Sequence, residues 1–347
     1  MNVPVTRGLS RQTELVRSFK GGSLSGTYLI RHSGKLCVRK VVSLTLNREY
    51  GFFRWYTQLK RLQRFGQLFP GVFPNVLRYG REGESAYFDM EYIEGSVSGF
   101  EFLSGNPPRH EIDEFFSALC CSMDRLHAFR RPTSMSALNL YIYEEMERPL
   151  EVCGADPGFR EFLSHPTLVL NGEEVPALAD NLKAAYELGE RFFLNPFECY
   201  THGNLTLENT LWVPSKRQLW FVDPYEENIL DTVQNEYSQL LQSSNSYYEV
   251  YNSLNAVVEG NRVTLEIESS PGIDYFNSKL WSMLRQRLTG KDEVIVRLYE
   301  VSQFTRMLPF KLSVARDKMI FFYALASRLF HELLDDVEAG RIEGVAM

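Results

Sequence analysis

A short polar segment and the strand pair after it carry the residues with the clearest chemical potential. Residues 201–211 are THGNLTLENTL, and residues 221–225 are FVDPY. We expect a polar loop that runs into a short strand, with Asp223 ending the paired strand, so that this hairpin places Asn209 and Asp223 close together. An amide oxygen and a carboxylate are hard donors that suit Mg²⁺ beside nucleotide phosphates. The plain alternative is a turn Asn and a capping Asp, which is common for either residue alone but less so for the joint pattern.

The same segment resembles the catalytic loop of the aminoglycoside phosphotransferase and choline kinase-like family, relatives of protein kinases. The family pattern is His-Gly-Asp, an Asn five residues later, and a hydrophobic strand that ends in Asp. The resemblance implies a protein-kinase-like fold with two lobes, Asn209 and Asp223 as magnesium ligands, and His202 as a residue that orders the loop. It covers most of the chain, from about residue 15 to residue 335.

The chain departs from the family at position 204, where the resemblance implies the catalytic base. Asn204 stands in place of the usual Asp. An amide can orient a hydroxyl but cannot accept its proton, and general-base catalysis contributes about 10²–10⁴-fold. Three explanations stay open: a natural pseudoenzyme, an engineered inactive variant, and an active site with another base. Glu208 and Asp231 lie nearby in sequence, and by resemblance Asp231 braces the loop.

A turn rich in Gly and Ser near the N-terminus is a candidate phosphate-binding loop. Residues 20–29 are KGGSLSGTYL, a turn that leads into a strand. Main-chain N–H groups can approach phosphates closely in such a turn, although glycines also make plain hairpins. The candidate cofactor-binding residues here are Gly21, Gly22, Ser23, Ser25 and Gly26.

The next strand, residues 36–41 (LCVRKV), offers a cation for those phosphates. Strand alternation puts Val38 and Lys40 on one face and Arg39 on the other. This resembles the kinase strand in which a small apolar residue contacts adenine and a Lys two positions later binds phosphates. Lys40 is our choice, Arg39 is the alternative if the register slips, and a solvated Lys is the plain reading. Glu49, early in the following helix, would pair with Lys40.

Residues 90–95 (MEYIEG) follow a strand and precede a change in sequence character. They resemble the family hinge, where main-chain groups of Glu91, Tyr92 and Ile93 would contact the adenine. An edge strand that ends at Gly95 is the alternative. His127, at the end of a helical segment, also matches a family feature, and we interpret it as a packed residue.

The periodicities of the chain predict an α+β protein with a small β-rich N-lobe, residues 1–95, and a larger, mainly helical C-lobe, residues 96–347. Strands are expected at 27–31, 35–42, 75–79, 85–92, 211–213, 219–222 and 262–267. Helices are expected at 48–65, 111–129, 180–193, 235–242, 274–288 and 318–335. Residues 132–176 contain several Pro and Gly and are expected to be irregular.

The composition limits the classes of protein that the chain can represent. With 347 residues, 44% of them hydrophobic, it has enough apolar material for a substantial core and is not a disordered chain. The net charge of −7 argues against a dedicated duplex-DNA binder. The five cysteines are odd in number and lack CxxC spacing, so neither a disulfide set nor a zinc site is expected. With no signal peptide and no long apolar run, we expect a cytoplasmic protein without nucleic-acid or membrane partners.

Three functions remain in competition. The first, by resemblance, is an ATP- and Mg-dependent phosphotransferase acting on a hydroxyl of a small molecule such as a sugar, an amino alcohol or an antibiotic, with GTP as the other possible donor. The second is an inactive pseudokinase that binds nucleotide and acts as a binding or regulatory protein. The third is nucleotidyl transfer in the same site. The sequence contains candidate acceptor-binding residues of both charges. Acidic residues that would suit a cationic acceptor are Glu144, Glu145, Glu147, Glu226 and Glu227, and basic residues that would suit an anionic or sugar-derived acceptor are Arg306, Lys311 and Arg316.

Overall fold

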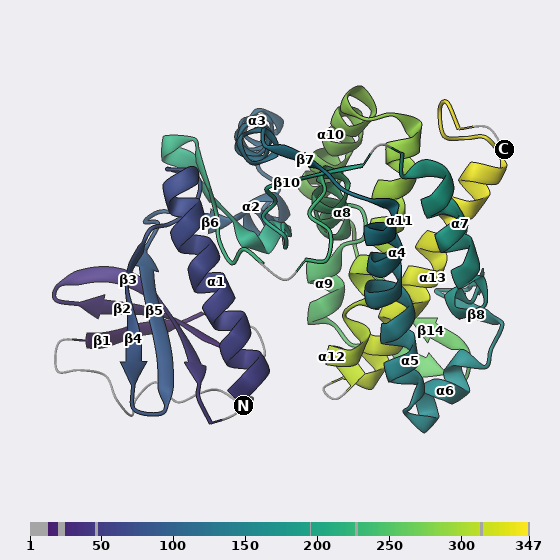
Figure 1. Ribbon diagram of the computed structural model, residues 1–347, viewed down its shortest axis with the longest axis horizontal. Coiled ribbons are helices and arrows are strands. Elements are labelled where there is room, and N and C mark those ends of the chain that lie inside the picture. The colour runs from purple at the N-terminus through teal and green to yellow at the C-terminus, as the bar shows by residue number, and fades with distance from the viewer. Residues whose placement is uncertain are drawn as a thin grey trace.

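The structure is a computed structural model of the chain. It describes residues 13–19, 25–45, 48–194, 196–225, 228–312 and 315–345, without the side chains of residues 48–50. Figure 1 shows two parts, a sheet with one long helix at the N-terminal side and a larger helical part. The expected α+β organisation with a β-rich N-lobe and a helical C-lobe is confirmed.

The N-lobe is an antiparallel sheet of five strands in the order β1-β2-β3-β5-β4. The strands are β1 (Thr13–Ser18), β2 (Gly26–His32), β3 (Lys35–Ser43), β4 (Val76–Glu82) and β5 (Ser85–Glu91). Ser33 and Gly34 both have positive φ between β2 and β3, as a two-residue hairpin turn requires. Helix α1 (Arg48–Leu68) buries Trp55, Leu59 and Leu62, spaced for one helix face, and Trp55 packs on Phe88 of β5.

The two lobes meet around a small three-stranded sheet in the order β12-β11-β6. Its strands are β6 (Val97–Ser98), β11 (Thr210–Val213) and β12 (Gln218–Phe221). Helix α2 (Gly99–Ser104) starts directly after β6, and Ser98 caps it in a reciprocal arrangement with Glu101. The segment that leaves the N-lobe therefore pairs with the hairpin that carries Asn209 and Asp223.

The C-lobe is built around α8 (Val233–Ser244) and α11 (Gly290–Thr305), two helices that are almost fully buried. Helix α11 packs against α8 on one side and α13 (Arg316–Glu338) on the other. The remaining helices are α3 (Arg109–His127), α4 (Met135–Ile142), α5 (Arg148–Gly154), α6 (Pro157–Leu163), α7 (Leu182–Phe192), α9 (Tyr248–Ser253), α10 (Pro271–Arg287) and α12 (Leu308–Leu312). The remaining strands are β7 (Arg130–Pro132) paired with β10 (Phe197–Cys199), and β8 (Thr167–Leu170), β9 (Glu173–Pro176), β13 (Val257–Glu259) and β14 (Arg262–Thr264) in a second small sheet.

The expectation that residues 132–176 are irregular is wrong. Helices α4, α5 and α6 and strands β8 and β9 occupy this stretch, with a π-helical turn at Tyr143–Glu147. Pro149 and Pro157 lie in the first turns of α5 and α6, where the missing N–H costs no hydrogen bond. Proline is compatible with the start of a helix as well as with irregular structure, so its presence alone does not predict an irregular segment.

No described helix has the length and apolar character needed to cross a bilayer.

Candidate active site

The hairpin predicted from residues 201–223 is present and brings Asn209 and Asp223 onto adjacent segments. Strands β11 and β12 pair with Thr210 opposite Phe221, and the Val222 N–H donates to the Asn209 carbonyl at 2.9 Å. Asn209 ends a 3₁₀ turn, Leu207–Asn209. Asp223 follows β12 with a φ of 57°, a left-handed conformation that turns the chain sharply after the strand.

Both predicted metal ligands keep an oxygen available for a cation. Asn209 Nδ2 donates to the Asn204 carbonyl at 2.7 Å, and Asn209 Oδ1 has no hydrogen bond to the described residues. Asp223 Oδ1 receives Lys40 Nζ at 2.7 Å, and Oδ2 has no hydrogen bond to the described residues. Two protein oxygens suit Mg²⁺, which usually completes its shell with phosphate and water. Within the described ranges, no three His, Cys, Asp or Glu side chains form a separate metal cluster.

Lys40 and Arg39 lie on opposite faces of β3. Lys40 is buried and faces Asp223, so its ion pair joins the N-lobe to the C-lobe. Arg39 is 2% exposed and makes a two-point contact with Asp89, with Arg39 Nε 2.7 Å from Asp89 Oδ1 and Arg39 Nη2 3.0 Å from Oδ2. The Arg39 guanidinium also lies over the Tyr87 ring. Of the two cations considered, the structure places Lys40 with the hairpin and Arg39 in a buried ion cluster of the N-lobe.

Asn204 lies at the centre of the polar loop, and its side chain makes no hydrogen bond to any residue that the structure describes. Its main chain is fixed, because the Asn204 N–H donates to His202 Nδ1 at 3.2 Å and its carbonyl receives Asn209 Nδ2 and the Thr206 N–H. The amide is therefore held by its backbone and free to contact a ligand. Glu208, one of the alternative bases, is exposed.

His202 is fully buried and ties the loop to the Asp223 segment. Its Nε2 lies 2.7 Å from the Val222 carbonyl, and its Nδ1 receives the Asn204 N–H. The ring therefore carries its proton on Nε2, with Nδ1 as acceptor. Burial lowers the pKa of His202 to about 4, so the ring is neutral at physiological pH. This geometry makes His202 a positioning residue.

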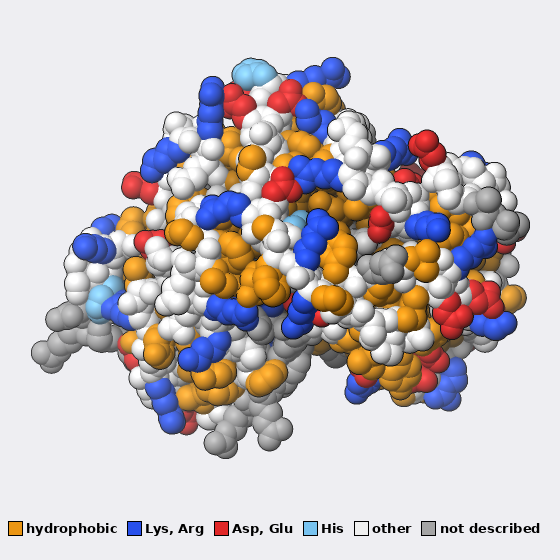
Figure 2. Space-filling model, turned by 45° about the horizontal axis from the view of Figure 1, so that its top comes forward, with side chains coloured by type: hydrophobic (Ala, Val, Ile, Leu, Met, Phe, Trp, Pro, Cys, Tyr) orange, Lys and Arg blue, Asp and Glu red, His pale blue; other side chains and the backbone are white. Residues whose placement is uncertain are grey.

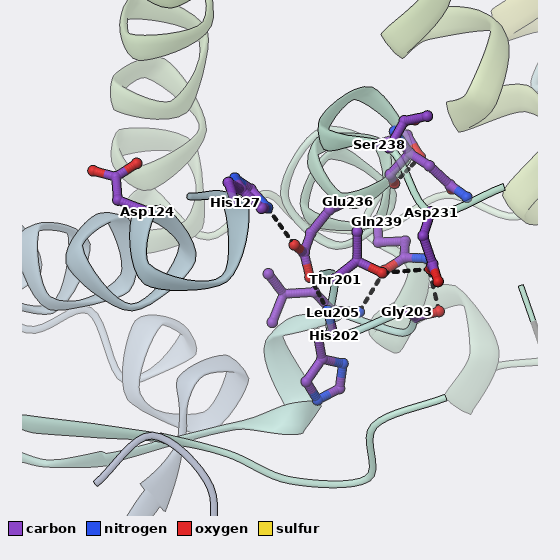
Figure 3. Close-up of polar contacts among 12 residues, drawn as sticks. Asp124, His127, Thr201, His202, Gly203, Leu205, Asp231, Glu236, Ser238 and Gln239 are labelled. Carbon is purple, nitrogen blue, oxygen red and sulfur yellow. Dashed lines mark hydrogen bonds and ion pairs between the residues drawn. The ribbon is translucent and has the colours of Figure 1, made fainter. Parts of the chain in front are cut away.

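Helix α8 holds the loop through buried polar side chains that the sequence analysis did not identify. Glu236 Oε1 accepts the His202 N–H at 2.5 Å, Gln239 Oε1 accepts the Leu205 N–H at 2.6 Å, and Ser243 Oγ accepts the Leu207 N–H at 3.0 Å. Figure 3 shows Glu236 and Gln239 reaching from α8 to the loop. Positions 236, 239 and 243 share one helix face, which was the available signal. We call these three side chains the α8 clamp.

The α8 clamp extends into two further buried groups. Glu236 Oε2 lies 2.5 Å from His127 Nε2, so His127 is a packed residue that supports the clamp. Glu249 Oε1 accepts from Ser243 Oγ at 2.7 Å, and the Glu249 Oε2 atom is buried without a partner among the described residues. Burial raises the pKa of Glu249 to about 7.

The start of the loop is fixed by Asp231, in the bracing position that the resemblance implied. Asp231 Oδ1 accepts from Thr201 Oγ1 at 2.6 Å and from Asn228 Nδ2 at 3.0 Å. Burial raises the pKa of Asp231, while the Arg61 guanidinium and these two donors oppose that shift. Gly203 has a φ of +83°, and a Cβ there would lie 2.4 Å from the Tyr225 carbonyl oxygen, so only glycine fits.

The nucleotide side of the site is described only in part. Gly21, Gly22 and Ser23 lie outside the described residues, as does the side chain of Glu49 in the first turn of α1. Ser25 precedes β2, and Gly26 is its first residue, opposite Val41. Val38 shares the Lys40 face of β3 and lies opposite Met90.

The hinge residues have some main-chain groups engaged and others open. The Glu91 N–H donates to the Asn75 carbonyl at 3.0 Å, and the Ile93 carbonyl accepts from Ser96 Oγ at 2.7 Å. Neither main-chain group of Tyr92 nor the Ile93 N–H is bonded to a described residue. The main-chain groups left open to an adenine therefore belong to Tyr92 and Ile93.

Several of the charged acceptor candidates are bound to neighbours. Glu144 pairs with Arg148 at 2.5 Å, Glu147 accepts from Tyr186 at 2.5 Å, and Arg316 pairs with Asp156. Lys311 donates to Asn252 at 2.7 Å. Burial raises the pKa of Glu145 although Arg306 opposes the shift, and Glu226 and Glu227 lie outside the described residues.

The fold and the paired lobes define a protein-kinase-like architecture, and solved structures agree. A candidate fructosamine-3-kinase from Haemophilus somnus 129PT aligns at a TM-score of 0.54 with 11% identity, over 94% of this chain and 92% of that chain. The GDP complex of an aminoglycoside 2′-phosphotransferase-IIIa mutant aligns at 0.54 with 14% identity, over 97% and 94%. These neighbours carry names of small-molecule kinases, and the implied protein-kinase-like fold is confirmed. No protein-family model and no curated protein sequence matches the chain.

Proposed function

We propose that this protein binds a Mg²⁺–nucleotide complex, ATP or GTP, and transfers a phosphoryl group to a hydroxyl of a small molecule. The observation that carries the proposal is the convergence of Lys40, Asn209 and Asp223, contributed by two lobes and joined by the 2.7 Å ion pair. A cation for phosphates beside two oxygens for magnesium is the arrangement that phosphoryl transfer requires.

Each residue has a distinct role in this proposal. Asn209 and Asp223 would hold Mg²⁺, which neutralises charge on the phosphates, and Lys40 would exchange its contact with Asp223 for one with a phosphate. Asn204 would orient the acceptor hydroxyl through its unbonded amide. Because an amide cannot take the hydroxyl proton, we expect slow turnover, with positioning and charge stabilisation supplying most of the catalysis.

The competing proposal is a pseudokinase that binds nucleotide and acts by shape. It is favoured by Asn204, an amide where the resemblance implies the catalytic base, in a loop that keeps an ordered set of hydrogen bonds. The third possibility, nucleotidyl transfer, would use the same nucleotide site with cleavage at a different phosphate.

The test is product analysis with the wild-type protein and Asn204→Asp. Each is incubated with Mg-ATP or Mg-GTP and sugars, amino alcohols or aminoglycosides, and products are identified by mass spectrometry. We expect slow transfer of phosphate by the wild type and an increase of about 10²–10⁴-fold in Asn204→Asp, because a carboxylate restores the base.

Other outcomes separate the competing functions. Nucleotide binding without any turnover, in both proteins, would replace the phosphotransferase with the pseudokinase. A product that carries a nucleoside monophosphate would establish nucleotidyl transfer. Failure of Mg²⁺–nucleotide to bind at all would contradict both of the first two functions.

A further inference from the structure

Cationic and aromatic side chains form a continuous band over the exposed face of α1 and the adjoining edge of the C-lobe. We call it the basic–aromatic band and define it by six residues: Phe53, Tyr56, Lys60, Arg64, Phe129 and Arg130. It lies outside the candidate active site, and no residue of it has a role in the proposed function.

Contacts along the band show that it is one surface. The Lys60 ammonium lies 5.5 Å from the Tyr56 ring centroid, one helical turn away. Arg64 Nη2 donates to the Tyr200 hydroxyl at 2.8 Å and so connects α1 to the C-lobe. The Tyr200 ring stacks on Phe129 with centroids 5.1 Å apart, next to Arg130.

The band is strongly positive although the chain has a net charge of −7. Helix α1 contributes Lys60 and Arg64, both exposed, to the band. Arg125 and Arg131 add two cations beside Phe129 and Arg130. Of Lys60, Arg64, Arg125, Arg130 and Arg131, only Arg131 has a described carboxylate within 4 Å, Glu198 at 3.1 Å. Figure 2 shows blue and orange side chains intermingled over the middle of the drawn face, where red ones are sparse.

The aromatic members are unusually exposed for their size. Phe53 is 55%, Tyr56 42% and Phe129 51% exposed. Exposed aromatic rings beside cations on one face of a helix are typical of segments that lie in the interface of a membrane, where rings enter the headgroup region and cations meet lipid phosphates.

The arrangement of the rings favours a lipid surface over single-stranded nucleic acid. Bases stack on open ring faces. Phe129 and Tyr200 stack on each other at an interplanar angle of 29°, and Tyr56 stacks on Phe52 at 17°. Each of these stacking contacts covers a ring face and leaves less open ring surface for bases, whereas exposed rings beside cationic side chains suit acyl chains and headgroup phosphates.

We infer that the basic–aromatic band docks the protein peripherally onto an anionic membrane surface. The attraction comes from the charges of Lys60, Arg64 and Arg130, with Phe53 and Phe129 entering the interface. Such docking needs no spanning helix. This inference differs from the sequence-based expectation that the protein has no membrane partner.

The test is sedimentation of the full chain with vesicles of phosphatidylcholine alone or phosphatidylcholine mixed with phosphatidylglycerol. We expect binding to the mixed vesicles, weakened by salt, and little binding to the neutral ones. Neutralising two cations with Lys60→Gln and Arg64→Gln should weaken the binding about 30-fold, since each cation near an anionic surface contributes about fivefold. The matched control, Lys183→Gln with Lys291→Gln, removes two exposed lysines of α7 and α11 and should bind as the wild type does.

Thermal unfolding of each variant shows whether the fold is retained, and Phe53→Ser provides an independent second variant that should weaken binding without changing the charge. Equal binding to neutral and anionic vesicles, or no loss in either band variant, would overturn the inference. So would binding of single-stranded RNA through the same residues in the absence of vesicle binding. None of these outcomes depends on nucleotide binding or turnover, so the inference can fail while the proposed function stands.

Discussion

The two halves of the candidate active site are held in place by different means. In the N-lobe, Lys40 extends from a regular strand, and Arg39 and Asp89 lock the opposite face of the same strand. In the C-lobe, an irregular loop is held because Glu236, Gln239 and Ser243 accept hydrogen bonds from its main-chain N–H groups. The hydrogen bonds between paired strands are enough to orient a side chain on a strand. The main-chain groups of a loop need hydrogen-bond partners from elsewhere in the chain.

We expect the largest loss of stability from a substitution on the Arg39 face of β3, and a much smaller loss from one on the Lys40 face. Arg39→Met leaves Asp89, which is fully buried, without the two-point contact that Arg39 supplies, although Arg78 still pairs with Asp89. We expect the free energy of unfolding to fall by about 3–5 kcal/mol, the usual effect of breaking a buried ion pair. Chemical denaturation measures it.

The neighbouring substitution, Lys40→Met, is the matched counterpart. It should weaken nucleotide binding at least tenfold, because a hydrogen bond to a charged group contributes about 1.5–3 kcal/mol. The loss in the free energy of unfolding should be much smaller than that caused by Arg39→Met. If Lys40→Met left nucleotide affinity unchanged, the N-lobe half of the site would be assigned to the wrong residue.

The next largest loss of stability should come from a substitution in the α8 clamp. Gln239→Leu removes partners from two buried main-chain groups, the Leu205 N–H and the Gly203 carbonyl. We expect a loss of about 1–3 kcal/mol for each group left unsatisfied. Gln234→Leu, on the same helix, removes a single contact to Asp292 and should cost less. Equal effects of the two variants would show that Gln239 does not hold the loop.

The remaining effect is a pH dependence at the far end of the clamp. Because burial raises the pKa of Glu249 from 4.5 to about 7, the folded protein binds this proton more tightly than the unfolded chain does. Glu249 therefore lowers stability as the pH rises from about 4.5 to 7, and Glu249→Gln should remove that decrease.

Melting temperatures of the wild type and Glu249→Gln between pH 5 and pH 8 check this, and the exposed Glu259→Gln serves as the control. His202, whose pKa is lowered, has the opposite trend in both proteins and cancels in the comparison. If the melting temperatures of the wild type and Glu249→Gln changed with pH in parallel, the raised pKa of Glu249 would be contradicted.

The same contrast explains what the sequence could predict. Alternation placed Val38 and Lys40 on one face, and the turn at Ser33 and Gly34 fixed the β2–β3 register, so these features followed from local residues. The hairpin that pairs Thr210 with Phe221 was predictable for the same reason.

Features that depend on distant partners were not predictable. Helix α11 was missed because it is buried on nearly all sides and so lacks a clear polar face. The partners of Glu236 and Gln239 lie more than 30 residues away, so their polar character alone could not reveal the loop that they hold. The resemblance identified the loop itself but not the clamp behind it.

The most direct test of the account is titration of the protein with ATP by calorimetry, with Mg²⁺ and with a chelator, for the wild type and Asp223→Ala. If Asn209 and Asp223 hold a metal beside the phosphates, the wild type will bind ATP far more tightly with Mg²⁺, and Asp223→Ala will abolish that difference. Equal affinity of the wild type with and without Mg²⁺, or a Mg²⁺ effect that persists in Asp223→Ala, would contradict the account.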